Sequence, residues 1–219
     1  SLVISLKTEI ETRVGLKTVD YEVLYRLALL QGQLEGQQNT WRKDLNIGET
    51  ITRLDHFFFS SRLDLMNHFL LLNKLAKVES KFDIDRQQLL LNWLETEPAL
   101  LPSIHIRKRI FELYSKPLDL EAFDNLLSDL ENFRINLSNE DLSKFFAFLR
   151  TYCSYNIRNG HGEMWAPLFK IQQSNLADGY FYIDGKIAPG TFLNVVRAAL
   201  EANELPWALN FINEHHIRI

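Results

Sequence analysis

The sequence holds a single cysteine, Cys153, among 219 residues. An intrachain disulfide is therefore excluded, and this chain alone cannot assemble a metal cluster from several thiolates. Cys153 follows Leu149 and Tyr152 on an apolar stripe, where we expect it to act as a small hydrophobic side chain and not as an activated nucleophile. Scarce cysteine is typical of a reducing compartment, so we expect a cytoplasmic protein.

Long apolar runs are also missing. The longest, such as 69–72 and 89–91, are far shorter than the roughly 20 residues that cross a bilayer. The stretch 1–18 alternates apolar and charged side chains and does not resemble a secretory signal. We therefore expect no membrane partner.

The charge has no strong excess of either sign. Lys and Arg number 24 against 28 Asp and Glu, and the net charge of -4 is spread along the chain. No basic arm is present that would bind a phosphate backbone. Since 46% of the residues are hydrophobic, the chain can bury a sizeable core.

Only nine Gly and six Pro occur, mostly between segments of helical periodicity, and strand patterns are scarce. The spacing predicts an all-α fold, with a first helix over 20–34, helical sequence over 47–78 and a helix over 86–95. The runs 57–59 and 69–72 are apolar on all sides, which indicates that these turns are covered on more than one side. A break near Ser60–Ser61 would turn 47–78 into a helix pair.

Three antiparallel helix pairs are predicted beyond this point, over 103–134, 139–176 and 189–216. Asp119 is expected to cap the second helix of the first pair, and Ser138 to Asp141 resembles a capping box. Together these elements predict one helical-repeat domain over 1–219, with the pairs stacked as a short right-handed α-solenoid.

The last two pairs repeat a pattern. Phe148-Leu149 is followed after fifteen residues by Trp165-Ala166 and Phe169, and Phe192-Leu193 is followed after thirteen by Trp207-Ala208 and Phe211. Ala122, Ala166 and Ala208 recur early in the second helix of each pair. Small side chains there would let paired helices approach closely while the aromatic residues fill the groove between pairs.

The last pair, 192–216, resembles a divergent tetratricopeptide or pentatricopeptide unit, with Phe192, Val195, Ala208 and Ile212 at matching positions. It departs from a tetratricopeptide unit at Val196, Ala199 and His215, where Gly, Tyr and Ala are usual. The resemblance covers about 103–216 and extends to uncharacterised bacterial proteins that end in similar helices. It implies a scaffold, without identifying the partner.

No catalytic motif stands out. The six histidines form no zinc-protease pair, and His56 and His68 cannot ligate one ion from a single straight helix. Asp55 and Asp64 could pair in a cavity, but a solvated helix face explains them better. The Gly160 to Glu163 segment brings a histidine and a glutamate together, and its glycines favour a simple connector. We therefore predict no catalytic residue, no metal site and no cofactor.

One basic cluster, Arg107-Lys108-Arg109 with Lys116, precedes a helix that carries five acidic residues from 119 to 131. These helices could exchange ion pairs or form a polar groove, and the acidic helix disfavours nucleic acid. Arg107 and Lys108 are candidate partner contacts.

A second candidate contact lies in the loop between the last two pairs. Its Asp-Gly sequence between apolar residues predicts a small β-hairpin. Tyr180, Phe181 and Tyr182 are expected to be ordered and partly packed, and could contact a partner.

These features favour a scaffold that binds a protein or peptide and has no catalytic activity. The alternatives are a small all-α enzyme with a site between helices and an RNA-binding repeat protein. The last helix has an apolar stripe without a capping repeat after it, which predicts a homodimer through 205–217 or a longer natural array.

Overall fold

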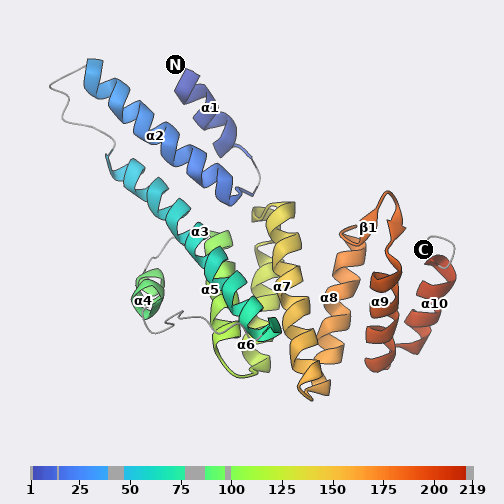
Figure 1. Ribbon diagram of the computed structural model, residues 1–219. Coiled ribbons are helices and arrows are strands. Elements are labelled where there is room, and N and C mark those ends of the chain that lie inside the picture. The colour runs from blue at the N-terminus through green and yellow to red at the C-terminus, as the bar shows by residue number, and fades with distance from the viewer. Residues whose placement is uncertain (1, 14, 39–46, 77–86, 97–99, 216–219) are drawn as a thin grey trace. The chain divides into compact units, whose positions relative to one another are not determined.

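The computed structural model describes residues 2–13, 15–38, 47–76, 87–96 and 100–215. The described residues are mostly helical, with ten α-helices and one short antiparallel hairpin, so the prediction of a helical fold with a hairpin is confirmed. The helices are α1 (Leu2–Glu11), α2 (Thr18–Gln38), α3 (Ile47–Ala76), α4 (Gln88–Thr96), α5 (Pro102–Ser115), α6 (Leu120–Asn132), α7 (Asn139–Arg158), α8 (Trp165–Ala177), α9 (Pro189–Glu201) and α10 (Leu205–His215), and the strands are β1 (Tyr182–Ile183) and β2 (Lys186–Ile187) (Figure 1).

Contacts between residues divide the chain into two compact units, Ser1–Leu142 and Ser143–Ile219. The predicted organisation as one domain stays a prediction. Helices α5 to α10 match the three ranges predicted as helix pairs, except that α5 begins one residue earlier and α8 ends one residue later.

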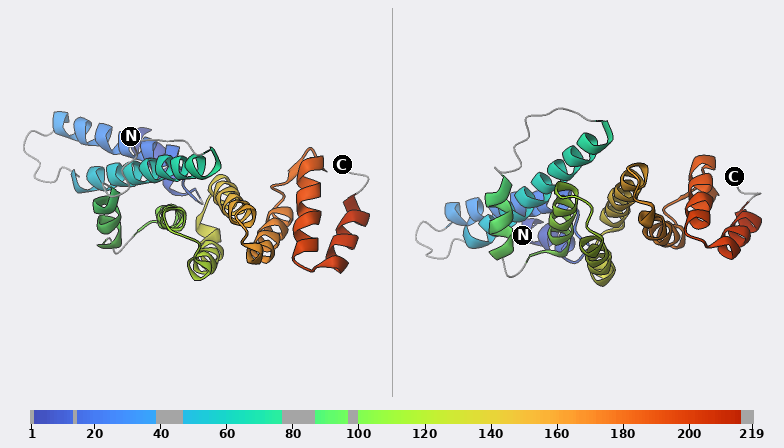
Figure 2. Two further views of the ribbon diagram at one scale, coloured as in Figure 1. Left: turned by 60° about the horizontal axis from the view of Figure 1, so that its bottom comes forward. Right: turned by 90° about the horizontal axis from the view of Figure 1, so that it is seen from below.

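Helix α3 organises the first unit. It is continuous over 30 residues, which confirms the helical pattern predicted for this stretch, and the alternative with a break near Ser60–Ser61 does not occur. Ser60 is fully buried inside the helix, where helix packing overrides the weak helix preference of serine. Figure 2 shows α2 and α3 side by side along much of their length. The buried face of α3, which packs toward α2 and α5, carries Phe59, Leu63, Met66 and Leu70.

The turn before α2 depends on a glycine. Gly15 has a φ of +69°, and a Cβ atom there would lie 2.2 Å from the backbone nitrogen of Ser138. Only glycine allows both the positive φ and this close approach of two chain segments. The segment before α7 is thereby held against the start of α2.

The predicted helix caps are confirmed. The Asp119 side chain accepts a hydrogen bond from the backbone nitrogen of Ala122 at 2.9 Å, and Ser138 Oγ accepts one from the backbone nitrogen of Asp141 at 3.1 Å. Each bond satisfies a donor that the first turn of a helix leaves without an internal partner.

The second unit is held together by aromatic packing. Ile187, Phe192, Val195 and Phe211 form a buried cluster against which the hairpin and α10 pack. Phe211 stacks between Phe192 and Trp207, with ring centroids 5.3 and 5.0 Å apart. In Figure 1, α8, α9 and α10 lie next to one another in chain order.

Equivalent residues in the two copies of the repeated pattern are not all buried to the same extent. Phe148 and Phe192 are both buried, as are Phe169 and Phe211. Ala208 is buried as expected of a small residue between paired helices, but Ala166 is exposed at the start of α8. The expected close-packing role is therefore wrong at Ala166, because the α8 face that carries this alanine is turned to solvent.

Candidate functional site

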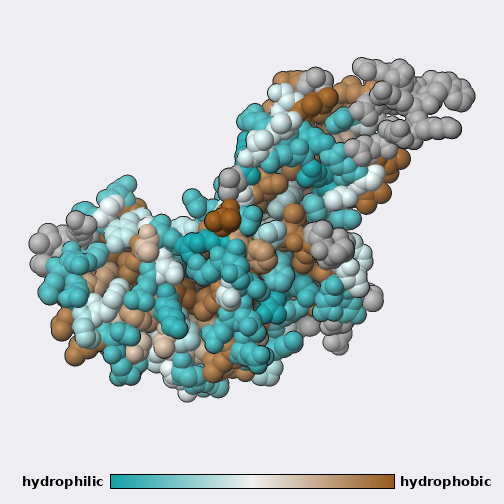
Figure 3. All heavy atoms as spheres, turned by 180° about the vertical axis from the view of Figure 1, so that it is seen from behind, coloured by the Kyte–Doolittle hydropathy of each residue, from teal (hydrophilic) through white to brown (hydrophobic). Residues whose placement is uncertain are grey.

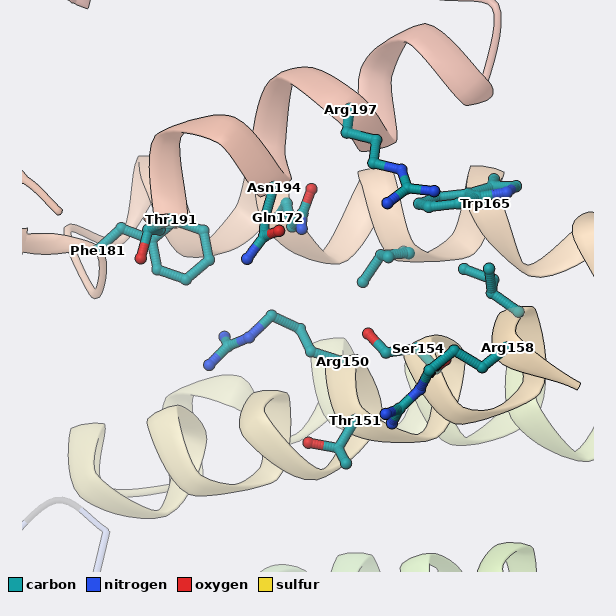
Figure 4. A pocket seen from close by; sticks show the side chains of 12 residues that line it. Arg150, Thr151, Ser154, Arg158, Trp165, Gln172, Phe181, Thr191, Asn194 and Arg197 are labelled. Atoms are coloured by element: carbon teal, nitrogen blue, oxygen red, sulfur yellow. Dashed lines mark hydrogen bonds between the residues drawn. The ribbon is translucent and has the colours of Figure 1, made fainter. Parts of the chain in front are cut away.

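A cavity with a volume of about 560 Å³ lies in the second unit. Helices α7, α8 and α9 and the segment before β1 supply its lining (Figure 4). We call it the arginine pocket, and its lining residues are Arg150, Thr151, Ser154, Ile157, Arg158, Trp165, Leu168, Gln172, Phe181, Thr191, Asn194 and Arg197.

Helix α7 supplies one side of the arginine pocket. Arg150, Ser154 and Arg158 follow at intervals of four residues, so they share one face of the helix. The opposite face of α7 buries Phe145, Leu149 and Tyr152. This packing fixes the rotation of the helix, and the polar row is consequently turned toward the pocket.

Two of the arginines lie over aromatic rings. The guanidinium carbon of Arg150 is 5.0 Å from the centroid of the Phe181 ring, and that of Arg197 is 5.2 Å from the centroid of Trp165. Figure 4 shows these two pairs toward opposite ends of the pocket. Cation–π contact holds each guanidinium in place without neutralising its charge.

Arg150 is the most enclosed of the three cations. Its Nη1 donates to Asn175 Oδ1 at 2.7 Å, and Asn175 is itself fully buried. Burial lowers the pKa of Arg150 below its ordinary value, because desolvation disfavours the charged form. An anion beside this guanidinium would relieve that penalty.

Gln172 adds a polar group without a partner among the described residues. Only 5% of its surface is exposed, it lines the pocket, and its Oε1 accepts no hydrogen bond from them. A buried amide oxygen without a partner costs about 1–3 kcal/mol. A ligand that donates a hydrogen bond at this point would recover this energy.

No Asp, Glu, His or Cys is among the described residues that line the arginine pocket. The lining therefore holds three guanidinium groups, two aromatic rings and neutral hydrogen-bonding side chains. Such a set can bind an anion and pair with amide groups, and it provides no general base.

The predicted contact residue Phe181 lies in this pocket, and its neighbours lie close by. Tyr180 and Tyr182 are half-buried, with Tyr180 packed near Phe146 and the Tyr182 hydroxyl 3.0 Å from His215 Nε2. The prediction that these three aromatic residues are partly packed is confirmed. The hairpin turns at Asp184-Gly185, where both residues have positive φ as a tight two-residue turn requires.

Arg107 and Lys108 lie in the first unit. Arg107 is fully buried, so it does not present the surface contact that the sequence suggested. It donates to Asp64 Oδ1 at 2.8 Å and to Asp141 Oδ1 at 2.7 Å. Lys108 is largely covered and pairs with Glu112 on its own helix at 2.7 Å.

The expected ion pairing between α5 and α6 is confirmed at Asp129. His105 Nε2 lies 3.0 Å and Arg109 Nε 3.6 Å from its Oδ2 atom. Asp129 thus links α6 to α5, whereas Arg107 and Lys108 pair with carboxylates outside α6.

Asp55 and Asp64 do not share a cavity. Asp64 bonds to Arg107, whereas Asp55 lines a small cavity of about 90 Å³ beside Trp93. His161 and Glu163 contact each other at 3.1 Å in an exposed connector. Within the described ranges, no group of three His, Cys, Asp or Glu residues is arranged to hold a metal ion.

Arg150, Arg158 and Arg197 were not among the residues predicted from the sequence. The two arginines of α7 could have been found from the polar residues that follow one another at intervals of four. Arg197 lies much later in the chain, and no local pattern links it to them.

Among the described helices, none has the length and apolar character needed to cross a membrane. No family model, curated protein or solved structure matches the chain.

Proposed function

We propose that this protein is a helical-repeat scaffold that binds an acidic segment of a partner protein in the arginine pocket and has no catalytic activity. One observation carries the proposal. Three arginine side chains line a cavity whose described lining contains no carboxylate.

The charge distribution of the second unit supports an anionic ligand. Residues 143–219 contain seven Lys and Arg and six Asp and Glu, so this part of the chain is nearly neutral. Three of the seven cations nevertheless line the pocket, and none of the acidic residues belongs to its described lining. A concave site lined by one sign of charge focuses its field and attracts ligands of the opposite sign.

The neutral groups of the pocket favour a peptide. Gln172 and Asn194 carry amides that donate and accept, which is what the N–H and C=O groups of an extended chain require. A volume of about 560 Å³ lies in the range of pockets that enclose small ligands or a few residues. Acidic side chains of such a segment would then pair with the arginines.

Nucleic acid is the weaker candidate. Unpaired bases bind by stacking on free aromatic faces. In this pocket a guanidinium already covers one face of both Trp165 and Phe181. The net charge of -4 also gives the chain no general attraction for a phosphate backbone.

The wider assignment rests on the sequence resemblance and on the consecutive helices α5 to α10. We assign these helices to a divergent tetratricopeptide-like array, stacked as a right-handed solenoid. The single, buried Cys153 supports a reducing compartment such as the cytoplasm.

A binding titration tests this function. A fluorescently labelled peptide rich in Glu and Asp, titrated with the full chain, should bind, and Arg150→Gln should weaken binding at least about 10-fold through loss of a charged hydrogen bond. Arg26→Gln is the matched control, because Arg26 is exposed on α2 and pairs only weakly at the surface with Glu22.

Two results would contradict the proposal. One is equal binding of the acidic peptide by the Arg150→Gln and Arg26→Gln variants. The other is retention of single-stranded RNA by the wild-type chain with no affinity for the acidic peptide.

A further inference from the structure

The exposed face of α3 carries a regular apolar row. Ile51, Phe58, Leu65 and Leu72 follow one another at intervals of seven residues. A second series with the same interval contains Ile47, Leu54 and Leu75, with Ser61 and His68 at its two remaining positions. The two series alternate in steps of three and four, which is the spacing of the a and d positions of a coiled coil. We call the combined row the α3 seam.

The seven apolar residues of the α3 seam are all exposed, with exposed fractions between 39% for Leu54 and 73% for Leu65. In Figure 3, apolar residues reach the surface beside the end of α2 and the start of α3. The core contacts of α3 use the other side of the helix, through Phe59, Leu63 and Met66. The core therefore explains the apolar residues on the inner side of α3, and among the described residues its outer side lacks a cover.

From these observations we propose that the α3 seam is a dimer interface, on which the α3 helix of a second copy of this chain packs in antiparallel orientation. The seam runs along almost the whole of α3, about 42 Å at 1.5 Å per residue. Its seven apolar residues are each 39–73% exposed, so two facing copies would cover a long, continuous strip of the kind that a specific interface of roughly 1,200–2,000 Å² requires.

The side chains fit an antiparallel copy. If Phe58 faces Ser61 of the second copy, the largest residue of the seam lies against the smallest. In the same register Leu54 faces Leu65, Ile51 faces His68, and Ile47 faces Leu72. A parallel pair would instead place Phe58 against Phe58, Ser61 against Ser61 and His68 against His68.

The charges beside the seam agree with this register. Asp55 and Arg62 lie on the same flank, one position after a d residue, and Arg62 lies over the Phe58 ring with its guanidinium carbon 5.5 Å from the centroid. In the antiparallel register, Asp55 of one copy and Arg62 of the other differ in level by only about 3 Å along the axis. Two such opposite-charge contacts arise by symmetry, which is what a self-complementary interface requires.

Sedimentation equilibrium of the full chain tests the proposal. We expect a dimer between about 1 and about 100 μM, because interfaces of this size associate at micromolar concentration or below. The double variant Ile51→Glu with Leu65→Glu should raise the dimer dissociation constant at least about 100-fold, since it places charges in an apolar contact. Leu65→Gln is a milder change at the most exposed position, and it should also raise the dimer dissociation constant. Circular dichroism should show that its helix content is unchanged.

A matched control uses the apolar face of α10. Leu205 and Leu209 are exposed to a degree similar to Ile51, so Leu205→Glu with Leu209→Glu introduces equal charge at the other predicted dimer surface. This variant should remain dimeric. A monomeric wild-type chain at about 100 μM, or a dimer that only the α10 variant dissociates, would overturn the proposal.

Cross-linking tests the orientation. Chains with Leu72→Cys mixed with chains carrying Ile47→Cys should form a disulfide between the two kinds of chain, because these positions face each other in the antiparallel register. Leu72→Cys alone should not cross-link, since its two copies would lie about 37 Å apart. Cross-linking of Leu72→Cys alone would show a parallel pair and refute the antiparallel arrangement. The native Cys153 is buried and does not interfere.

Discussion

The buried guanidinium of Arg107 donates from Nη2 to Oδ1 of Asp141 at 2.7 Å, and so joins α5 to the first turn of α7. The same guanidinium bonds Asp64 on α3 through Nε and the Ser103 carbonyl through Nη1. Three helices therefore depend on one side chain. A residue that the sequence suggested as a partner contact is instead an internal connection.

Replacement of Arg107 should accordingly cause a large loss of unfolding free energy. Arg107→Ala leaves two carboxylates in a buried setting without their cation, and this type of loss costs about 3–5 kcal/mol. Arg109→Ala removes a neighbouring arginine that is partly exposed and pairs with Asp129 at 3.6 Å, so it should cost about 0–1 kcal/mol. Urea unfolding of both variants gives the comparison. Similar losses would show that Arg107 does not have this connecting role.

A second prediction concerns Gly15. Gly15→Ala places a methyl group 2.2 Å from the Ser138 nitrogen in a backbone with positive φ, so one of the two segments must move. We expect a loss of about 1–3 kcal/mol or more from strain alone. Gly32→Ala is the control, because Gly32 lies within α2 and no described atom lies within 4 Å of the added Cβ. That change should stabilise the protein by about 1 kcal/mol through helix propensity. Thermal unfolding curves that shift in the same direction for both variants would argue against this account.

Two aromatic residues of the hairpin segment should have different roles, one in stability and the other in binding. Tyr182 packs on the buried cluster and its hydroxyl contacts His215, whereas Phe181 lines the arginine pocket under Arg150. Tyr182→Ala should therefore cost about 2–4 kcal/mol of unfolding free energy. Phe181→Ala should reduce affinity for the acidic peptide and cost less stability. Calorimetry should show the larger loss of stability for Tyr182→Ala, and the peptide titration should show the larger loss of affinity for Phe181→Ala. If the same variant shows the larger loss in both measurements, the two residues do not have separate roles.

The sequence predicted the helices well where their pattern depends on local chemistry. Periodic apolar residues and capping side chains define α5 to α10, and the Asp-Gly turn defines the hairpin. Helix α1 was missed because Ile10 is its only buried residue, so it shows no strong apolar stripe. The run from Phe57 to Phe59 is apolar on all sides, which predicted that this part of α3 is covered on more than one side. The structure resolves this differently, with Phe59 turned to the core and Phe58 to the exposed seam.

The candidate site was less accessible to sequence reasoning. Phe181 was correctly selected, because an aromatic residue in a connector must either pack or contact a partner. Its partner Arg150 lies well before it on α7, and Arg197 lies well after it on α9. Their convergence depends on how α7, α8 and α9 pack, which the periodicity of each helix does not specify. The same reason explains Arg107, whose burial depends on carboxylates from α3 and α7.

The last prediction uses the environment of Cys153, which is fully buried on α7. Burial raises the pKa of its thiol far above its ordinary value, because desolvation disfavours the thiolate. A group with a raised folded-state pKa contributes its full stability below the unfolded-state pKa and loses it as the pH rises further. The Cys153 contribution should thus be constant up to about pH 8.5 and then fall by about 1.4 kcal/mol per pH unit.

The variant Cys153→Ala isolates this thiol, which is needed because burial also raises the pKa of Tyr21 and stability at high pH has more than one source. The difference in unfolding free energy between this variant and the wild type should shrink between about pH 8.5 and about pH 10. In the same pH range a thiol reagent should modify the wild-type chain only after denaturant is added. Rapid modification of the folded protein, or a difference between the two chains that does not change with pH, would show that the thiol is not enclosed by α7 and its neighbours.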